Sequence, residues 1–161
     1  MDKFEPQRRT TSTSTSGGSR RRATTVALRR TLAASVLTAG SVHLYLWVNG
    51  YRELPTVGPL FVLNFAASIL IAATVVATPR VVGYALAMAF GASTIGAFLL
   101  SVAVGISGYK EVLLGRAQAV AGTAELAALF LGGWLMARSV RAGRGREADS
   151  SRGKQPLRRA S

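Results

Sequence analysis

Residues 81–105 read VVGYALAMAFGASTIGAFLLSVAVG, a stretch without a single charged side chain. The uncharged run is longer still, because 29 residues separate Arg80 from Lys110. A helix rises about 1.5 Å per residue, so roughly 20 apolar residues cross the hydrocarbon core of a bilayer. A helix on the surface of a water-soluble bundle would carry a charged face, and this stretch has none. It therefore predicts a helix that spans a membrane.

Three further windows have the same character. They lie between residues 30 and 52, between 53 and 80, and between 116 and 138, and only the last contains a charged residue, Glu125. We therefore predict an all-α fold, a four-helix transmembrane bundle that occupies residues 24–140. The predicted spans are residues 31–48, 56–77, 81–105 and 117–137.

The chain of 161 residues carries 20 Lys and Arg side chains against seven Asp and Glu, a net charge of +13. Seventeen of the 20 basic residues lie on one side of the predicted spans, in the two terminal segments and at Arg80, and three lie on the other side. Because Lys and Arg stay on the cytoplasmic side, we expect a multi-pass protein of the cytoplasmic membrane with both termini cytoplasmic. The charge thus reports membrane topology, and we expect no nucleic-acid partner.

The two terminal segments have the composition of disordered chain. Residues 1–23 are rich in Ser, Thr and Arg. Residues 141–161 consist largely of Gly, Ser and charged residues, chiefly Arg. Neither segment holds enough apolar side chains to form a core. We therefore expect two disordered cytoplasmic tails that are attracted to the anionic lipid surface.

Two predicted outer turns share a sequence pattern. Residues 50–54 read GYREL and residues 108–112 read GYKEV, at an offset of 58 positions. The pattern indicates either a duplicated helical hairpin or the common needs of an outer turn, which are glycine, an interfacial tyrosine and a solvated ion pair. The charged residues of these outer loops are Arg52, Glu53, Lys110 and Glu111.

Small residues recur at every fourth position along residues 81–105. Lipid provides no hydrophobic drive for association between membrane helices, so small side chains that allow close approach favour a packing face. We expect this row to form a helix–helix interface within the chain or a contact between copies in a homo-oligomer. Its members are Ala85, Ala89, Ser93, Ala97, Ser101 and Gly105.

Four polar residues, one for each predicted span, fall at similar depth in the outer half of the membrane: His43, Asn64, Ser101 and Glu125. Glu125 is the most informative, because it lies about nine residues, or roughly 13 Å, inside the outer end of its helix. A carboxyl group there is costly unless it is protonated or paired. Either the four residues hydrogen-bond one another and fix the packing, or they form a site for a small ligand, a lipid headgroup, a quinone or a proton.

The stretch from residue 43 to residue 61, HLYLWVNGYRELPTVGPLF, resembles a motif of small, uncharacterised four-transmembrane-helix proteins from high-GC bacteria of the actinobacterial type. The resemblance extends over residues 25–138. The segment Glu125-Leu126-Ala127-Ala128, within an Ala/Gly-rich helix, is similar in a weaker way to DoxX-like proteins. Both resemblances imply a four-helix membrane protein, and neither implies a particular activity.

Motifs that carry chemistry are scarce. The absence of cysteine excludes disulfides and a thiol nucleophile, and a single histidine argues against a metal site. We expect no enzyme, no metal and no cofactor. The expected function is a non-enzymatic accessory protein or a bundle that binds a small ligand or lipid, and the alternative is a proton-linked small-molecule transporter acting as an oligomer. The expected partners are the lipid bilayer and a second copy or another membrane protein.

Overall fold

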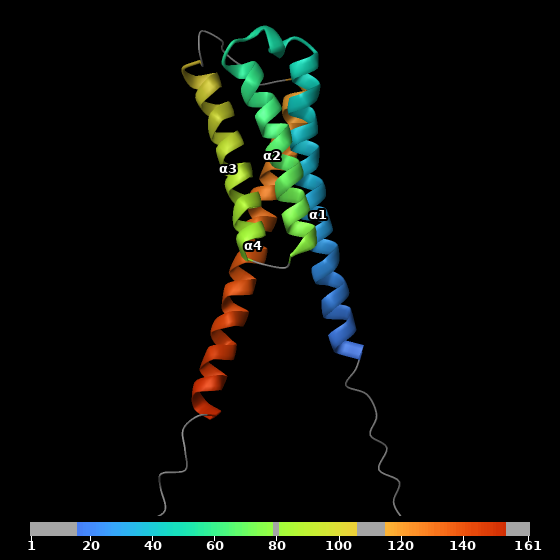
Figure 1. Cartoon of the computed structure of the whole chain (residues 1–161), viewed down its shortest axis with the longest axis vertical. Coiled ribbons are helices and arrows are strands. Elements are labelled where there is room, and N and C mark those ends of the chain that lie inside the picture. Colours follow the sequence, from blue (N-terminus) through green and yellow to red (C-terminus); the bar gives the residue numbers. More distant parts are fainter. Residues whose placement is uncertain (1–15, 79–80, 106–114, 154–161) are drawn as a thin grey trace, which may run out of the picture.

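The computed structural model describes residues 16–78, 81–105 and 115–153. Within these ranges the chain forms long helices and one short 3-10 turn, and no strand. The elements are α1 (Ser16–Val48), η1 (Tyr51–Glu53), α2 (Val57–Ala77), α3 (Val81–Ala103) and α4 (Arg116–Gly153) (Figure 1). Each of the four long helices is apolar enough to span a membrane, and even α2, with 21 residues, reaches about 32 Å. The predicted all-α fold, a four-helix transmembrane bundle, is confirmed.

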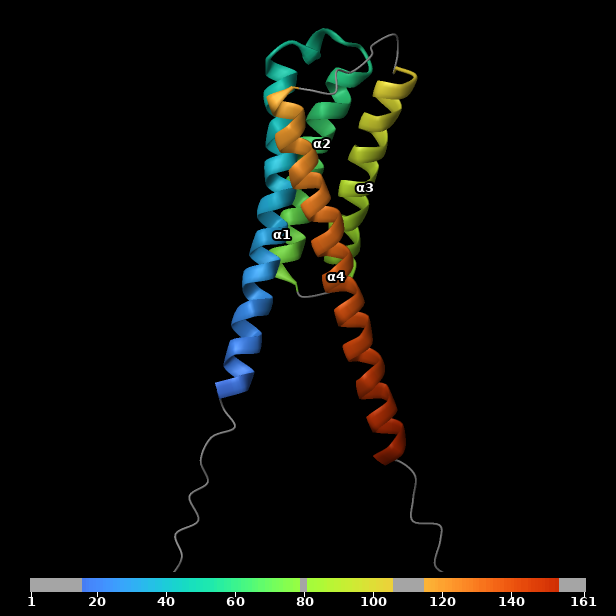
Figure 2. The ribbon, with the colours of Figure 1, turned by 180° about the vertical axis from the view of Figure 1, so that it is seen from behind.

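The helices are arranged as two hairpins that meet along one seam. α1 packs along α2, α4 packs along α3, and α1 and α4 contact each other, whereas α2 and α3 make sparse contacts (Figures 1 and 2). We call the end that carries residues 49–56 the distal end, and the end from which α1 and α4 continue the basal end. The hairpin duplication stays a prediction, because residues 108–112 lie outside the described part of the chain.

Large apolar side chains cover the outside of the bundle. Leu63 is 63% exposed, Leu70 is 69% exposed and Phe130 is 69% exposed. A water-soluble protein rarely leaves such a continuous apolar surface uncovered, whereas a bilayer solvates it at no cost. The outside of the bundle is therefore the surface that faces lipid.

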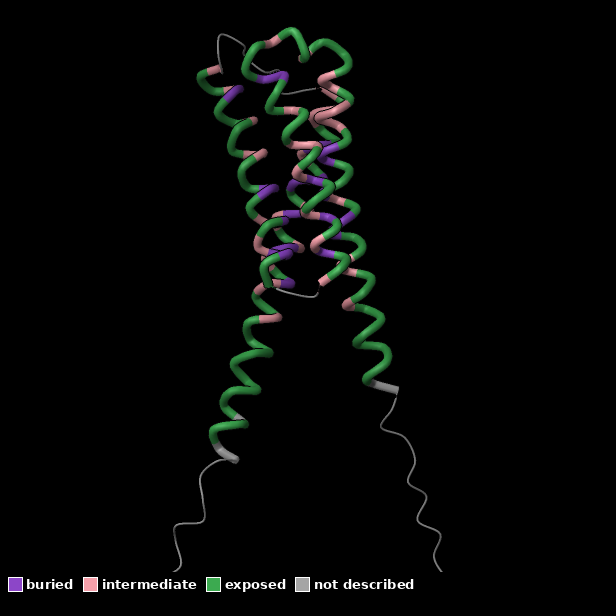
Figure 3. The backbone as a smooth tube through the Cα atoms, in the orientation of Figure 1, coloured by how far each residue is buried: buried purple, intermediate pink, exposed green. Residues whose placement is uncertain are grey.

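The tightest packing lies in the basal half of the bundle. Leu32 and Val36 from α1, Val75 from α2 and Tyr84 from α3 are almost completely inaccessible. Figure 3 shows that the buried residues gather where the helices face one another and are absent from the described basal extensions of α1 and α4. The basal half is thus the packed core that holds the four helices together.

Glycines determine how closely α3 and α4 approach. A Cβ atom added at Gly91 would lie 2.5 Å from the carbonyl oxygen of Glu125, and one added at Gly132 would lie 2.9 Å from the carbonyl oxygen of Tyr84. In both places the obstacle is the backbone of the facing helix, so a side chain at either glycine would push the helices apart. Small residues therefore do set the packing of this pair, as expected for membrane helices.

The interface nevertheless uses a different face of α3 from the expected one. Gly83 and Gly91 are buried, whereas Ala89, Ser93 and Ala97 of the predicted small-residue row are exposed. Both faces of α3 carry small residues, and the face with two glycines lets the helix backbones come closest. The expected intrachain interface is therefore wrong for these three exposed members of the row, whereas Ser101 is buried at the cavity. The use of the row between copies in an oligomer stays a prediction.

The helices continue beyond the predicted spans at the basal end. α1 begins at Ser16 and α4 ends at Gly153, so residues 16–23 and 141–153 are helical, and their expected disorder is corrected. A segment that continues an existing helix needs no new nucleation step, and Arg and Ala are good helix formers. Residues 1–15 and 154–161, the rest of the predicted tails, lie outside the described residues.

One arginine at the basal end caps a helix. The Arg29 guanidinium on α1 donates hydrogen bonds to the carbonyl oxygens of Val75 and Val76, at donor–acceptor distances between 2.8 and 3.1 Å. These carbonyl groups belong to the last turn of α2, where carbonyls lack helical partners and the helix dipole is negative. Arg29 thus joins α1 to the end of α2, in addition to its contribution to the charge of the basal end.

Candidate ligand-binding cavity

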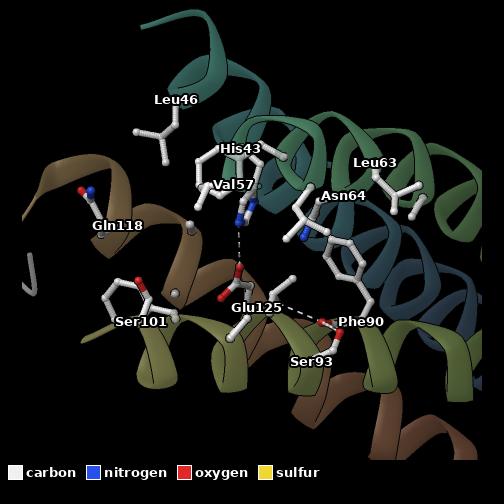
Figure 4. Close-up of a pocket in the computed structure, with 18 residues that line it drawn as sticks. His43, Leu46, Val57, Leu63, Asn64, Phe90, Ser93, Ser101, Gln118 and Glu125 are labelled. Atoms are coloured by element: carbon white, nitrogen blue, oxygen red, sulfur yellow. Dashed lines mark hydrogen bonds and ion pairs between the residues drawn. The ribbon is translucent and has the colours of Figure 1, made fainter. Parts of the chain in front are cut away.

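A cavity of about 380 Å³ lies in the distal half of the bundle and is lined by all four long helices. The four predicted site residues all line it: His43 from α1, Asn64 from α2, Ser101 from α3 and Glu125 from α4. Figure 4 shows their side chains around one common space. The four residues, which lie at similar depths in their predicted spans, therefore surround one cavity in the folded chain.

Glu125 is only 4% exposed although it carries a carboxyl group. Its neighbours on the same face of α4, Ala121 and Ala128, are small and buried, which leaves room for the carboxyl group inside the bundle. The close approach at Gly91 brings α3 against the backbone of α4 at the same level. A buried ionisable group in a membrane span is costly, so such a position needs a partner or a function.

His43 is fixed by contacts on both sides of its ring. Its Nδ1 lies 2.8 Å from the carbonyl oxygen of Ala39, the residue one turn earlier on α1. Its ring meets Phe61 of α2 edge to face, with ring centroids 5.0 Å apart, and Phe61 in turn stacks on Tyr51 of η1. These contacts anchor the imidazole to the distal turn and direct its other nitrogen, Nε2, to the cavity.

The His43 Nε2 atom faces the Glu125 carboxyl group. Nε2 and Oε1 are 3.8 Å apart, which is too long for a hydrogen bond. Because a carbonyl oxygen can only accept, the Nδ1 contact with Ala39 requires the ring proton on Nδ1. A neutral ring then presents a lone pair to a carboxyl oxygen. Two facing lone pairs repel each other. The arrangement is therefore favourable only when one of the two groups binds a proton, or when another positive group lies beside them.

Asn64 adds a second polar group without a counterpart. Its Oδ1 atom is buried, and no group within the described ranges donates a hydrogen bond to it. Leaving a buried acceptor unpaired costs about 1–3 kcal/mol. Ser101, which is 8% exposed, places a hydroxyl group at the α3 wall of the same cavity. The cavity therefore combines apolar walls with a few polar groups that have spare hydrogen-bonding capacity.

Further cavity residues lie on the same helix faces as the predicted ones. Thr94 lines the cavity seven residues before Ser101, and Gln118 lines it seven residues before Glu125. The Thr94 hydroxyl lies 2.8 Å from the carbonyl oxygen of Phe90, and it is also within hydrogen-bonding reach of the Glu125 carboxyl group. Seven residues are two helical turns, so spacing from the predicted residues is a sequence signal that could have identified both.

The predicted outer-loop residues are only partly described. Arg52 Nε donates to Glu53 Oε1 at 2.9 Å within η1, and both side chains are exposed. An exposed ion pair of this kind contributes at most about 1 kcal/mol. Lys110 and Glu111 lie outside the described residues. Neither described residue lines the cavity, so the loop pair belongs to the aqueous surface.

Comparison of the chain with protein-family models, curated proteins and solved structures gives no match. Within the described ranges, no group of three His, Asp or Glu side chains is placed to hold a metal ion.

Proposed function

We propose that this chain is a non-enzymatic protein of the cytoplasmic membrane that binds a small, largely apolar molecule in the distal cavity. A volume of about 380 Å³ falls within the range of about 300–1,000 Å³ that is typical of ligand pockets. It is roughly two and a half times the size of an engineered 150 Å³ cavity that holds one benzene molecule. A bicyclic molecule is therefore an appropriate size for the ligand.

The observation that carries this proposal is the incomplete pairing of the polar groups in the cavity. A polar cluster that only fixes helix packing is stabilising when each member is hydrogen-bonded, and costly when members are left unpaired. Here Thr94 is within hydrogen-bonding reach of Glu125, but the His43–Glu125 pair is too long for a hydrogen bond, and Asn64 Oδ1 has no described partner. A ligand that supplies the missing hydrogen bonds accounts for both features, and helix packing alone accounts for neither.

The expected orientation places the cavity on the outer side of the membrane. The described basic residues concentrate on the basal parts of α1 and α4, which the charge rule assigns to the cytoplasm. The cavity lies at the opposite end, near η1. With this topology the ligand comes from the outer leaflet or the external medium, and a bundle that holds it could serve as an accessory subunit of a membrane complex.

Proton-linked transport, the alternative, would need access to Glu125 from both sides of the membrane. The basal half is filled by buried side chains, among them Val75, Tyr84 and Leu135, which favours binding over transport for this conformation. Cysteine scanning distinguishes the two, because the chain has no native cysteine. For a binding protein, a cysteine at Ala121 reacts with a thiol reagent supplied from outside and is never labelled from inside. Labelling from both sides would favour transport.

Ligand binding itself can be tested with 2-naphthalenemethanol, a neutral bicyclic probe, and the protein in lipid nanodiscs. Ala97 is exposed and lines the cavity, so Ala97→Trp should fill part of it and weaken binding. Ala92 is exposed on the same helix and does not line the cavity, so Ala92→Trp is the matched control. Equal probe uptake by the wild type and both variants, measured by equilibrium dialysis, would show partition into lipid alone and refute the proposed function.

A further inference from the structure

Two hydrogen-bond acceptors face each other across the distal cavity from different helices, His43 Nε2 on α1 and the Glu125 carboxyl group on α4 (Figure 4). A third acceptor, Asn64 Oδ1 on α2, is buried within the wall of the same cavity. The imidazole proton on Nδ1 is already used by the Ala39 carbonyl, and Asn64 Oδ1 has no donor within the described ranges. Such a site calls for a ligand group that is rich in donors, and a primary ammonium group carries three N–H donors and no acceptor.

The charges around Glu125 favour a cation over a neutral donor. Facing it from α1 is His43, while the cavity-lining residues of α2 and α3 within the described ranges include no titratable or charged side chain. On α4, Glu125 is itself the one charged group that lines the cavity. Lys and Arg are likewise absent from the described lining, so an ionised Glu125 has no fixed positive partner other than a protonated His43.

One proton therefore keeps the pair neutral, whether it is bound to His43 Nε2 or to the Glu125 carboxyl group. Removing that proton leaves one negative charge in a membrane interior, which is strongly unfavourable unless another positive charge takes its place. A bound ammonium group provides that charge. The exchange is balanced in charge, because one cation enters the cavity and one proton leaves to water. The bond to that proton is the one covalent bond that breaks.

The rest of the cavity fits an apolar body attached to such a cation. Phe61, Phe90 and Phe98 line it, and aromatic faces attract both apolar rings and cations. Leu60 and Leu63 of α2 also line it while remaining 50% and 63% exposed on the outside of the bundle. The α2 wall is therefore shared by the cavity and the lipid surface, beside the sparse α2–α3 contact. A lipophilic molecule dissolved in the bilayer meets the cavity there.

We infer that the distal cavity takes a lipophilic organic cation, a protonated amine with a body of about two rings, in exchange for the one proton bound by the His43–Glu125 pair. This inference rests on the proposed ligand-binding function and adds the chemical class of the ligand. Neutral molecules of the same shape bind more weakly, because they cannot replace the proton. Anions of the same shape are excluded, because they would meet the His43 Nε2 lone pair and the ionisable Glu125 carboxyl group, with no Lys or Arg in the described lining.

The test uses three probes with one naphthalene body: 1-naphthylmethylammonium, naphthalenemethanol and naphthaleneacetate. Binding to the full chain in nanodiscs is taken as the difference between the wild type and Ala97→Trp, which subtracts partition into lipid. The ammonium probe should bind at least about tenfold more tightly than the alcohol, because charge-assisted hydrogen bonds are about twice as strong as neutral ones. The acetate should show no specific binding.

Proton exchange gives a second, independent readout. A pH indicator in weakly buffered solution should report about one proton released for each ammonium probe bound. Over the range in which the pair is protonated, the dissociation constant should rise about tenfold for each unit by which the pH falls, because one proton competes with one cation. Glu125→Gln keeps the shape of the side chain but should abolish both the proton release and the preference for the ammonium probe, while binding of the alcohol persists.

The outcomes separate the two proposals. If the alcohol binds as tightly as the ammonium probe and no proton is released, the cation inference is overturned while ligand binding stands. If no probe distinguishes the wild type from Ala97→Trp, ligand binding in this cavity is refuted, and the cation inference falls with it. Loss of folding in Glu125→Gln is monitored by its gel-filtration profile, and the pH dependence of the wild type remains decisive in that case.

Discussion

Replacing Gly91 by alanine tests the α3–α4 packing at the level of the cavity. The new Cβ atom would lie 2.5 Å from the Glu125 carbonyl oxygen and 3.0 Å from the backbone nitrogen of Leu129. Ordinary van der Waals contact begins at 3.4 Å, so the helices would have to separate by about 0.9 Å at this point. Both obstacles are backbone atoms of α4, and no change of side-chain conformation can relieve the clash.

The size of the effect follows from a comparison with Gly96 in the same helix. Alanine is favoured over glycine in a helix by up to about 1 kcal/mol, and this gain applies to both Gly91→Ala and Gly96→Ala. A Cβ atom at Gly96 meets nothing within 4 Å, so Gly96→Ala should gain the helix-propensity free energy without any steric cost. Overpacking at Gly91 costs about 1–3 kcal/mol. The difference between the two variants therefore isolates the clash, with Gly91→Ala less stable by about 1–3 kcal/mol.

The assay is reversible unfolding of the detergent-solubilised protein by titration with SDS, followed by circular dichroism. We expect the free energy of unfolding of Gly96→Ala to equal or exceed that of the wild type. The value for Gly91→Ala should be lower than both. Gly91→Ala should also weaken probe binding, because α3 and α4 line the cavity together. Equal stability of the two alanine variants would refute the close α3–α4 contact and, with it, the positioning of Glu125 described above.

Three further predictions concern the cavity, the basal cap and the topology. Asn64→Leu removes an unpaired buried acceptor, so it should raise the free energy of unfolding by about 1–3 kcal/mol and weaken probe binding. A loss of stability would mean that Asn64 is hydrogen-bonded. Arg29→Met removes the α2 cap, so it should lower the free energy of unfolding in the same SDS titration by about 1–3 kcal/mol. Arg30 is exposed, so Arg30→Met makes the same charge change and should have little effect. On intact cells, a membrane-impermeant maleimide should label Asn49→Cys and spare Ala142→Cys; the reverse pattern would invert the topology.

The extent of the helices at the basal end was the least predictable part of the fold. Composition alone suggests disorder for residues 16–23 and 141–153, because these segments have little to bury. The structure continues α1 and α4 through them. An isolated segment of that composition would have to nucleate a helix, whereas here the membrane-spanning helix has already formed, and each added residue contributes a hydrogen bond.

The sequence by itself determined which residues cross the membrane and at what depth the polar ones lie. A bilayer imposes a length of about 20 apolar residues on every span, so the spans and the depth of Glu125 can be read directly along the chain. Lipid is apolar on every side of a helix, however, and gives little information about rotation around the helix axis. Only the tertiary structure decided that rotation, because it depends on how closely backbones meet. The face of α3 that carries Gly91 packs on α4, and this contact leaves Glu125 facing His43 across the cavity.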